Sequence, residues 1–521
     1  MPSPCGLLAF HLQTVVPEQR LVPVQAKGED DWEERKAPLY KRMVRSFGFA
    51  LCLGGVAGCT VGPDFKRPDA PQVSGYTTTP IAEQTVASPG ILGNEQRLVT
   101  AQVPVSWWKE LNSAKLNSLI ELAFKASPTL SAAQATLRQA KQNYEAQSGS
   151  TELPQVNAKL DAQRQGTNSA AMGLPGGERT SNLYNASVAV SYDLDLAGGS
   201  RRELEALAAQ IDYQSFQLEG VRLDLAANVA LAAISQAQLT EQIKASKEIL
   251  RAQQEQLEIT QKRLDAGAAS ENEVLALQTE VEQTRAGIPG LNNRLEQSRH
   301  LLAVLTGQFP GAADVQNFTL ADFSLPADLP LSVPSELVRR RPDIRASEAL
   351  LHAASAQYGV AIAKLYPQLT LTGTLGSQAL TTASLFGPGS LIWSLGGQLA
   401  QPLFNPGLRS NTRAAEAGLD AAGANYRQTV LQALRNVADV LRTIESDAEA
   451  QLSLVTANES AQQSLGLIQQ QYALGAASYL QLLQAQQQAQ QVSINVLAIQ
   501  AQRLVNTVAL YQAMGGDWVE P

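Results

Sequence analysis

The chain has 521 residues, of which 40 are Lys or Arg and 48 are Asp or Glu, so its formal net charge is −8 at pH 7. This excess of acid gives the chain no electrostatic reason to bind nucleic acid. Charged residues make up only 17% of the chain and aromatic residues 5%, and this composition is typical of long helices that meet through small side chains.

The first informative segment is a lipoprotein signal that ends at Cys59. An apolar run follows a group of basic residues and ends in Val56-Ala57-Gly58-Cys59. Basic residues hold such a signal on the cytoplasmic face, the apolar stretch inserts, and small residues fit a peptidase that cuts beside a lipidated thiol. We therefore expect residues 43–58 to be removed and Cys59 to carry a covalent lipid, the only cofactor expected. A buried thiol is the ordinary alternative.

Residues 1–42 do not fit a secretion signal. They carry an acidic cluster between Glu29 and Glu34, ahead of the apolar run, so we expect translation to start near Met43 and residues 1–42 to be a misassigned extension. The other two cysteines, Cys5 and Cys52, precede Cys59. A mature chain with one cysteine has no disulfide framework and no thiolate metal site.

A tandem duplication organises the rest of the chain. Leu153-Pro154-Gln155 recurs 213 residues later as Tyr366-Pro367-Gln368, and Gly267-Ala-Ala-Ser270 recurs 208 residues later as Gly475-Ala-Ala-Ser478. Two copies of one unit follow from these repeats. The expected segments are an extended, lipidated N-terminal segment at 59–110, the first copy at 111–307, a linker at 308–331, the second copy at 332–515 and a tail at 516–521.

Each copy is expected to contain a helix, two strands, a long helix, a turn and a second long helix. No proline occurs between Pro175 and Pro289 or between Pro406 and Pro521, as long helices require, because proline removes a donor and clashes with the preceding turn. Apolar residues recur at helical spacing. A helix from about Arg201 to Ala266 would be roughly 100 Å long at 1.5 Å per residue, so it must run beside neighbouring helices in a rod or tube.

Alternating apolar and polar residues predict two strands in each copy, near 153–165, 184–196, 366–378 and 390–404. Each segment is close to the ~10 residues with which a tilted strand crosses an outer membrane, although alternation alone fits a half-buried soluble sheet equally well. Strands flanked by such long helices have no soluble core to cover, so we favour strands that span a membrane. No run of about 18 apolar residues follows Cys59, so no membrane helix is expected.

Four strands in one chain leave two unpaired edges. An unsatisfied backbone group in lipid costs several kcal/mol, so a barrel built from these strands must close by oligomerisation. The physical argument permits two or three chains.

The motifs resemble the TolC/OprM outer-membrane efflux proteins, in particular the lipidated NodT-like branch that serves resistance-nodulation-division (RND) pumps. The resemblance covers residues 59–516. It rests on these segments: Cys59-Thr-Val-Gly-Pro-Asp-Phe-Lys-Arg-Pro68, Trp107-Trp108, Arg340-Arg-Pro-Asp-Ile344, Tyr366-Pro-Gln-Leu369, Gln401-Pro-Leu-Phe404 and Tyr472-x-x-Gly475. It implies a mainly α-helical fold with membrane strands, in which a duplicated helix-strand-strand-helix unit gives four strands per chain to a trimeric 12-stranded outer-membrane β-barrel continuous with a long periplasmic α-helical barrel.

The resemblance implies a passive exit duct in the outer membrane, in contact with its lipid, that serves a periplasmic adaptor protein and an inner-membrane RND pump. No catalytic motif is present, and after Cys59 only His300 and His352 are histidines, so we expect no enzyme activity and no metal site. Two methionines after Met43 are too few for a soft-metal relay, which favours organic cargo such as drugs over copper or silver. A periplasmic adaptor or a structural coiled-coil lipoprotein without a pore is the alternative.

The helix-to-helix turns are expected at the periplasmic tip, opposite the strands. Glycine supplies the conformation that such turns need. In the similar family these turns meet the helical hairpin of the adaptor, which implies the following contact residues: Arg263, Gly267, Ser270, Tyr472, Gly475 and Ser478. The ordinary alternative is that they are turns and nothing more.

The resemblance also implies a closed aperture just beyond the tip, formed by acidic rings and a tyrosine. The matching residues are Glu273, Tyr472, Leu474, Gln481 and Gln484. Gln481 and Gln484 depart from the family pattern, because amides hydrogen-bond but carry no charge. We therefore expect weak cation binding at the mouth and a closure that rests on packing around Tyr472 and Leu474. Alternatively, these side chains face neighbouring helices and line nothing.

Overall fold

The computed structural model describes residues 60–73, 75–168, 178–311 and 316–516. The predicted extension at 1–42, the signal at 43–58 and Cys59 lie outside the described residues. The described chain is mainly helical, with four long strands.

Both copies have the predicted pair of strands followed by two long helices, but each begins with two helices rather than one. The first contains α2 (Ala114–Ala126), α3 (Pro128–Thr151), β2 (Gln155–Asn168), β3 (Glu178–Leu194), α4 (Gly199–Asp265) and α5 (Glu271–Leu305). The second contains α6 (Pro334–Arg340), α7 (Pro342–Ala363), β5 (Gln368–Ala379), β6 (Leu391–Ala400), α8 (Pro406–Ala473) and α9 (Tyr479–Ala513). Shorter elements are β1 (Arg97–Val99), η1 (Trp107–Leu111), η3 (Leu320–Asp322), β4 (Asp328–Pro330) and η4 (Thr382–Ser384).

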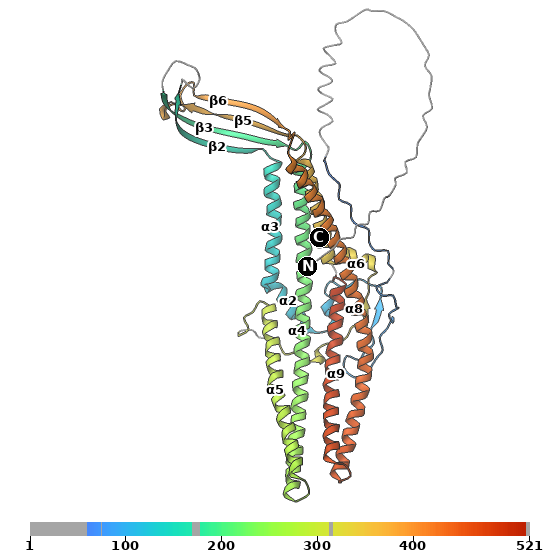
Figure 1. Cartoon of the computed structure of the whole chain (residues 1–521). Coiled ribbons are helices and arrows are strands. Elements are labelled where there is room, and N and C mark those ends of the chain that lie inside the picture. The colour runs from blue at the N-terminus through green and yellow to red at the C-terminus, as the bar shows by residue number, and fades with distance from the viewer. Residues whose placement is uncertain (1–59, 74, 169–177, 312–315, 517–521) are drawn as a thin grey trace, which may run out of the picture. The chain divides into compact units, whose positions relative to one another are not determined.

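Helices α4 and α8 have 67 and 68 residues, so each is roughly 100 Å long at 1.5 Å per residue. The shorter helices α3 and α5 lie end to end beside α4, and α9 lies beside the lower half of α8 (Figure 1). Close packing is possible because α4 buries a series of alanines, including Ala226, Ala230, Ala233 and Ala237. Of the helices in the described ranges, none combines the length and the apolarity needed to cross a membrane.

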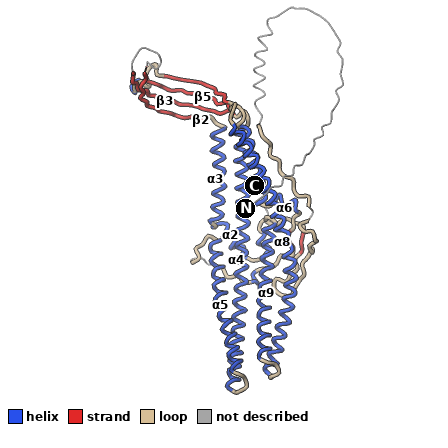
Figure 2. Tube along the Cα trace, viewed as in Figure 1, coloured by secondary structure: helices blue, strands red, loops and turns tan. Residues whose placement is uncertain are grey.

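The four long strands form one antiparallel sheet in the order β2-β3-β5-β6, so β2 and β6 are its edges (Figures 1 and 2). The register places apolar residues opposite one another: Ala158 pairs with Val188, Val188 with Leu375, and Leu375 with Trp393. The last three side chains are 46%, 59% and 74% exposed. An exposed apolar face of this kind marks a surface that lies against lipid or another molecule.

The strand ends differ most from the sequence expectation at two places. β3 begins at Glu178, before the predicted 184. β6 ends at Ala400 rather than at 404, because Pro402 has no backbone N–H to donate to the sheet.

The main core surrounds the middle of α4. Trp107 of η1 is 2% exposed and stacks on Tyr511 of α9, with ring centroids 5.4 Å apart. Ile120 of α2 and Leu504 of α9 are fully buried in the same cluster. Here η1 and α2 pack against the hairpins of both copies, and β1 pairs with β4 of the linker.

Candidate functional site

Both predicted turns lie at the ends of α4 and α8 that are remote from the sheet (Figures 1 and 2). Gly267 and Gly475 each have a φ of 76°, a left-handed conformation that glycine adopts without steric cost. The N–H of Ala268 donates to the carbonyl of Arg263 at 2.7 Å, and the N–H of Ala476 donates to that of Gln471 at 2.8 Å. These are matching Schellman caps, so the two copies close their hairpins in the same way.

The serines at the end of each turn begin the next helix. The Ser270 hydroxyl accepts from the N–H of Glu273, and the Ser478 hydroxyl accepts from the N–H of Gln481, both at 3.3 Å. The Gln481 side-chain oxygen accepts from the Ser478 N–H at 2.7 Å, which completes a capping box. Ser270, Ser478 and Gln481 therefore have a local structural role at the starts of α5 and α9.

Tyr472 lies at the centre of a cluster that joins the two hairpins. Its hydroxyl donates to the Glu273 carboxylate of α5 at 2.9 Å, and the Arg263 guanidinium of α4 lies 4.9 Å from its ring centroid. Tyr472 is 7% exposed. Burial raises the pKa of its hydroxyl and Glu273 raises it further, so the hydroxyl stays a neutral donor.

The other predicted aperture residues stay outside this cluster. Leu474 is 84% exposed, so its predicted packing is not formed within one chain. Gln484, one turn after Gln481, is exposed on α9.

A buried acid that was not predicted from the sequence lies further along the hairpin. Glu280 of α5 is 7% exposed and faces Gln253 of α4, which is 3% exposed. Burial raises the pKa of Glu280, and the Gln253 amide offsets part of this rise. Burial and the neighbouring Glu280 raise the pKa of Tyr479 to about 12. The helical spacing could have indicated this burial, because Glu280 follows the buried Leu277 by three residues and so lies on the same side of the helix.

We expect Glu280→Gln to flatten the pH dependence of thermal stability. Because the folded-state pKa of Glu280 lies above its ordinary 4.5, the folded chain keeps a proton that the unfolded chain loses. The free energy of unfolding therefore falls as the pH rises from the ordinary pKa of the carboxyl group through its raised pKa. The variant should match the wild type near pH 4 and exceed it near pH 8, measured by thermal unfolding. Glu282→Gln, an exposed neighbour on α5, should keep the wild-type slope, and an unchanged slope in Glu280→Gln would contradict the assignment.

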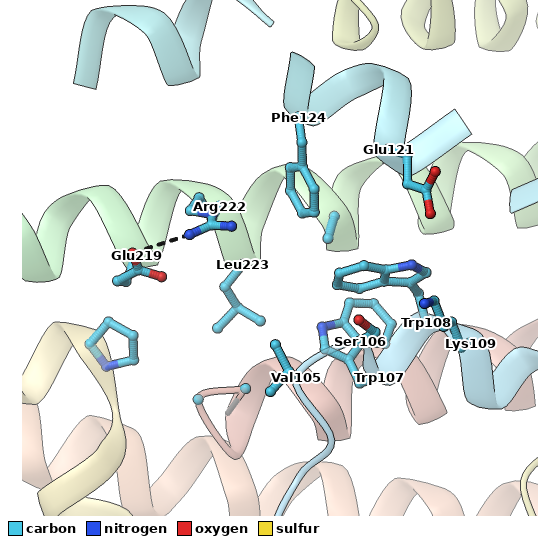
Figure 3. Close-up of a pocket in the computed structure, with 14 residues that line it drawn as sticks. Val105, Ser106, Trp107, Trp108, Lys109, Glu121, Phe124, Glu219, Arg222 and Leu223 are labelled. Carbon is cyan, nitrogen blue, oxygen red and sulfur yellow. Dashed lines mark hydrogen bonds and ion pairs between the residues drawn. The ribbon is translucent and has the colours of Figure 1, made fainter. Parts of the chain in front are cut away.

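A separate cavity of about 420 Å³ lies beside the middle of α4. Figure 3 shows its aromatic wall of Trp107, Trp108 and Phe124 facing the paired Arg222 and Glu219. Arg222 lies 5.6 Å from the Phe124 ring centroid. None of the predicted tip or aperture residues lines this cavity.

Comparison with known proteins identifies the family. The model of the outer membrane efflux protein family matches residues 119–308 and 333–516. The chain is 32% identical to the pyoverdine export outer membrane protein OpmQ of Pseudomonas putida over 79% of this chain and 88% of that protein. It is 27% identical to the probable outer membrane lipoprotein SilC of Salmonella typhimurium over 89% and 97% of the two chains.

The solved structure of the outer-membrane channel OprN matches with a TM-score of 0.78 and 28% identity, over 88% of this chain and all of that one. The two regions matched by the family model correspond to the two copies of the duplicated unit and cover most of each. The chain therefore belongs to the outer membrane efflux protein family, whose members are efflux channels of the outer membrane.

Proposed function

We propose that three copies of this chain form one passive exit duct. The observation that carries the proposal is the four-stranded sheet, which has an exposed apolar face and two edge strands, β2 and β6. In lipid, each unsatisfied backbone group at an edge costs several kcal/mol, so β2 of one chain must pair with β6 of the next. Three chains, as the family resemblance implies, give a barrel of twelve strands that continues into a tunnel of packed helices.

The polar side chains of the sheet support a wet lumen. The row next to Ala158, Val188 and Leu375 contains Asn157, Ala189, Thr374 and Ser394 in register. Successive residues of a strand point to opposite faces, so this row lies on the face away from the apolar one. With the apolar face in lipid, the hydroxyl and amide groups would line water.

The channel would serve a tripartite system, with a periplasmic adaptor and an inner-membrane RND pump that supplies the energy. The turns around Gly267 and Gly475 are the surfaces furthest from the sheet along α4 and α8. A partner that approaches from the periplasm would meet them first. We assign the adaptor contact to these turns and the closure of the tunnel to the cluster around Tyr472.

Lipidation of Cys59 would anchor each chain in addition to the strands. Each buried methylene contributes about 0.8 kcal/mol, so two or three acyl chains hold firmly. The residue after Cys59 is Thr60 rather than aspartate, which in the sorting logic of the similar family is an outer-membrane address. The similarity to a probable outer membrane lipoprotein supports the same assignment.

Organic molecules are the proposed cargo. Met172 lies outside the described residues, and Met514 is 1% exposed within the core, so Met514 offers no thioether to a metal ion in a lumen. A deletion strain should become sensitive to drugs, dyes or detergents. Sensitivity to silver or copper alone would contradict this choice.

Single-channel recording in planar bilayers tests the duct directly. Purified protein should insert and conduct, because only a closed barrel with a wet lumen provides a path for ions. The heat-dissociated protein is the control and should give no current. Absence of current from oligomers that are intact by size would favour a periplasmic adaptor or a structural coiled-coil lipoprotein.

A further inference from the structure

The residues that follow Cys59 are fixed at the junction between the sheet and the helices. The N–H of Val61 donates to the carbonyl of Ala197 at 3.0 Å, in the short connection between β3 and α4. Gly198 has a φ of 77°, and a Cβ there would come within 2.8 Å of the Thr60 Cα. Glycine at 198 thus supplies both the backbone conformation and the space for Thr60.

Arg202, in the first turn of α4, holds this segment with one buried side chain. The residue is 3% exposed. Its guanidinium donates to the carbonyls of Val61 at 3.3 Å and Gly62 at 3.4 Å, and to the Asp64 carboxylate at 2.7 Å. It also pairs with Glu205 at 2.7 Å. A guanidinium carries five donors in a fixed, planar arrangement. Its contacts therefore fix the positions of two backbone carbonyls and one carboxylate of the segment.

Helix α7 holds the other side of the segment. A Cβ at Gly62, which has a φ of 92°, would come within 2.7 Å of the Gly359 Cα. Phe65 stacks on His352 with ring centroids 4.3 Å apart, and His352 in turn lies 2.8 Å from Glu205. The segment Thr60–Phe65 is therefore packed between the start of α4 and helix α7.

We infer that Arg202 is a positioning residue for the lipid anchor, an inference that rests on the proposed lipidation of Cys59. Consecutive Cα atoms are about 3.8 Å apart, so a fixed Thr60 keeps the lipid attachment point beside the base of the sheet. The acyl chains then enter the membrane next to the strands and help to insert and assemble them.

Without the Arg202 contacts, the peptide segment that carries the lipid would be held less firmly beside the sheet. The next side-chain attachment is Phe65, which stacks on His352. A free segment between Cys59 and Phe65 has an r.m.s. span of roughly 13 Å. The lipid would still hold the chain to the membrane, but it would no longer keep the sheet at a fixed place. The effective concentration of the strands at the membrane would fall, and assembly would be less efficient.

A double-mutant cycle tests the inference. Arg202→Met is compared in the lipidated protein and in Cys59→Ser exported by a cleavable signal, and the fraction of envelope protein in detergent-resistant oligomers is measured. Mass spectrometry of the N-terminal peptide reports the lipid separately. We expect Arg202→Met to lower the oligomer fraction several-fold with the lipid intact, and to have little further effect without the lipid. A role limited to the structure of α4 would lower it equally in both backgrounds and would overturn the inference.

Two further variants keep the test decisive if Arg202→Met folds poorly. Asp64→Asn removes a carboxylate that is 88% exposed, so it cannot disturb the core, and it should show the same dependence on the lipid with a smaller loss. Arg201→Met, a neighbouring arginine with a 47% exposed side chain, should match the wild type. Normal oligomers in Arg202→Met and Asp64→Asn, with the lipid present, overturn the inference. Unmodified Cys59 in the wild type instead rejects the proposed lipidation.

Discussion

Valine at Gly267 or at Gly475 should abolish efflux while leaving the channel in the outer membrane. An ideal Cβ at either position meets no atom within 4 Å, so the substitution acts through the backbone and not through a clash. A β-branched residue strongly resists the φ of 76°. The Schellman cap would be distorted, and with it the proposed docking surface, whereas the long helices are held by packing far from the turn.

The measurement is the drug resistance of a deletion strain that carries each variant, together with the amount of oligomer in the outer membrane. Gly418→Val is the control, because Gly418 is an exposed helical glycine that also has no neighbour within 4 Å. Gly267→Asn should retain much of the activity, since asparagine tolerates the left-handed conformation. Normal export by Gly267→Val and Gly475→Val would show that these turns are not the docking surface.

The positions of these turns follow from the sequence because they depend on local chemistry. Gly267 and Gly475 are 208 residues apart in a duplicated segment, and they adopt the same φ in the same cap. The strands can also be predicted from the sequence, because apolar and polar side chains alternate along the strands of a sheet that has one face in water. The end of β6 could also have been predicted, because Pro402 has no N–H to donate to the hydrogen bonds of the sheet.

Pro289 shows where local rules fail. Proline-free stretches predict the long helices, yet α5 continues through Pro289. An interior proline costs about 3 kcal/mol. Tertiary packing offsets this cost, because the same helix buries Leu302 in the core shared with α4. Such an outcome depends on contacts that no local pattern contains.

The charged residues of the structure illustrate the same limit. Arg202 could be recognised as unusual, because it lies four residues before the buried Ala206 on the same face of α4. Its partner Asp64 is 138 residues away in the chain, and nothing in the spacing connects them. The pairing of Tyr472 with Glu273, 199 residues apart, was likewise not derivable from spacing. The family resemblance placed both at the aperture without joining them.

Tyr472→Ala should raise the basal conductance of the channel more than any other single change at the tip. The hydroxyl of Tyr472 ties α8 to α5 through Glu273, and its ring ties α8 to α4 through Arg263. A hydrogen bond to a charged group contributes about 1.5–3 kcal/mol, and a cation–π contact contributes about 0.5–2 kcal/mol. Since about 1.4 kcal/mol changes a population tenfold, loss of both contacts should shift the tip strongly toward open states.

The conservative variant separates the two contacts. Tyr472→Phe keeps the ring over which Arg263 lies and removes only the donor to Glu273, so its conductance should fall between those of the wild type and Tyr472→Ala. Single-channel current in planar bilayers is the measurement. If Tyr472→Ala conducts like the wild type, the cluster does not close the tunnel, although the duct would remain.

The amides of the second copy supply an independent test of the same aperture. Gln481→Asp and Gln484→Asp each place a negative charge where the chain has none, and a ring of three such charges at a pore mouth attracts polyvalent cations. Block of the current by such cations from the periplasmic side should therefore increase. Gln484 is the cleaner position, because the Gln481 oxygen also caps α9 through Ser478. Gln484→Asn, which keeps an amide, should leave the block unchanged, so that an increase with Asp alone identifies charge facing the permeation path as its cause.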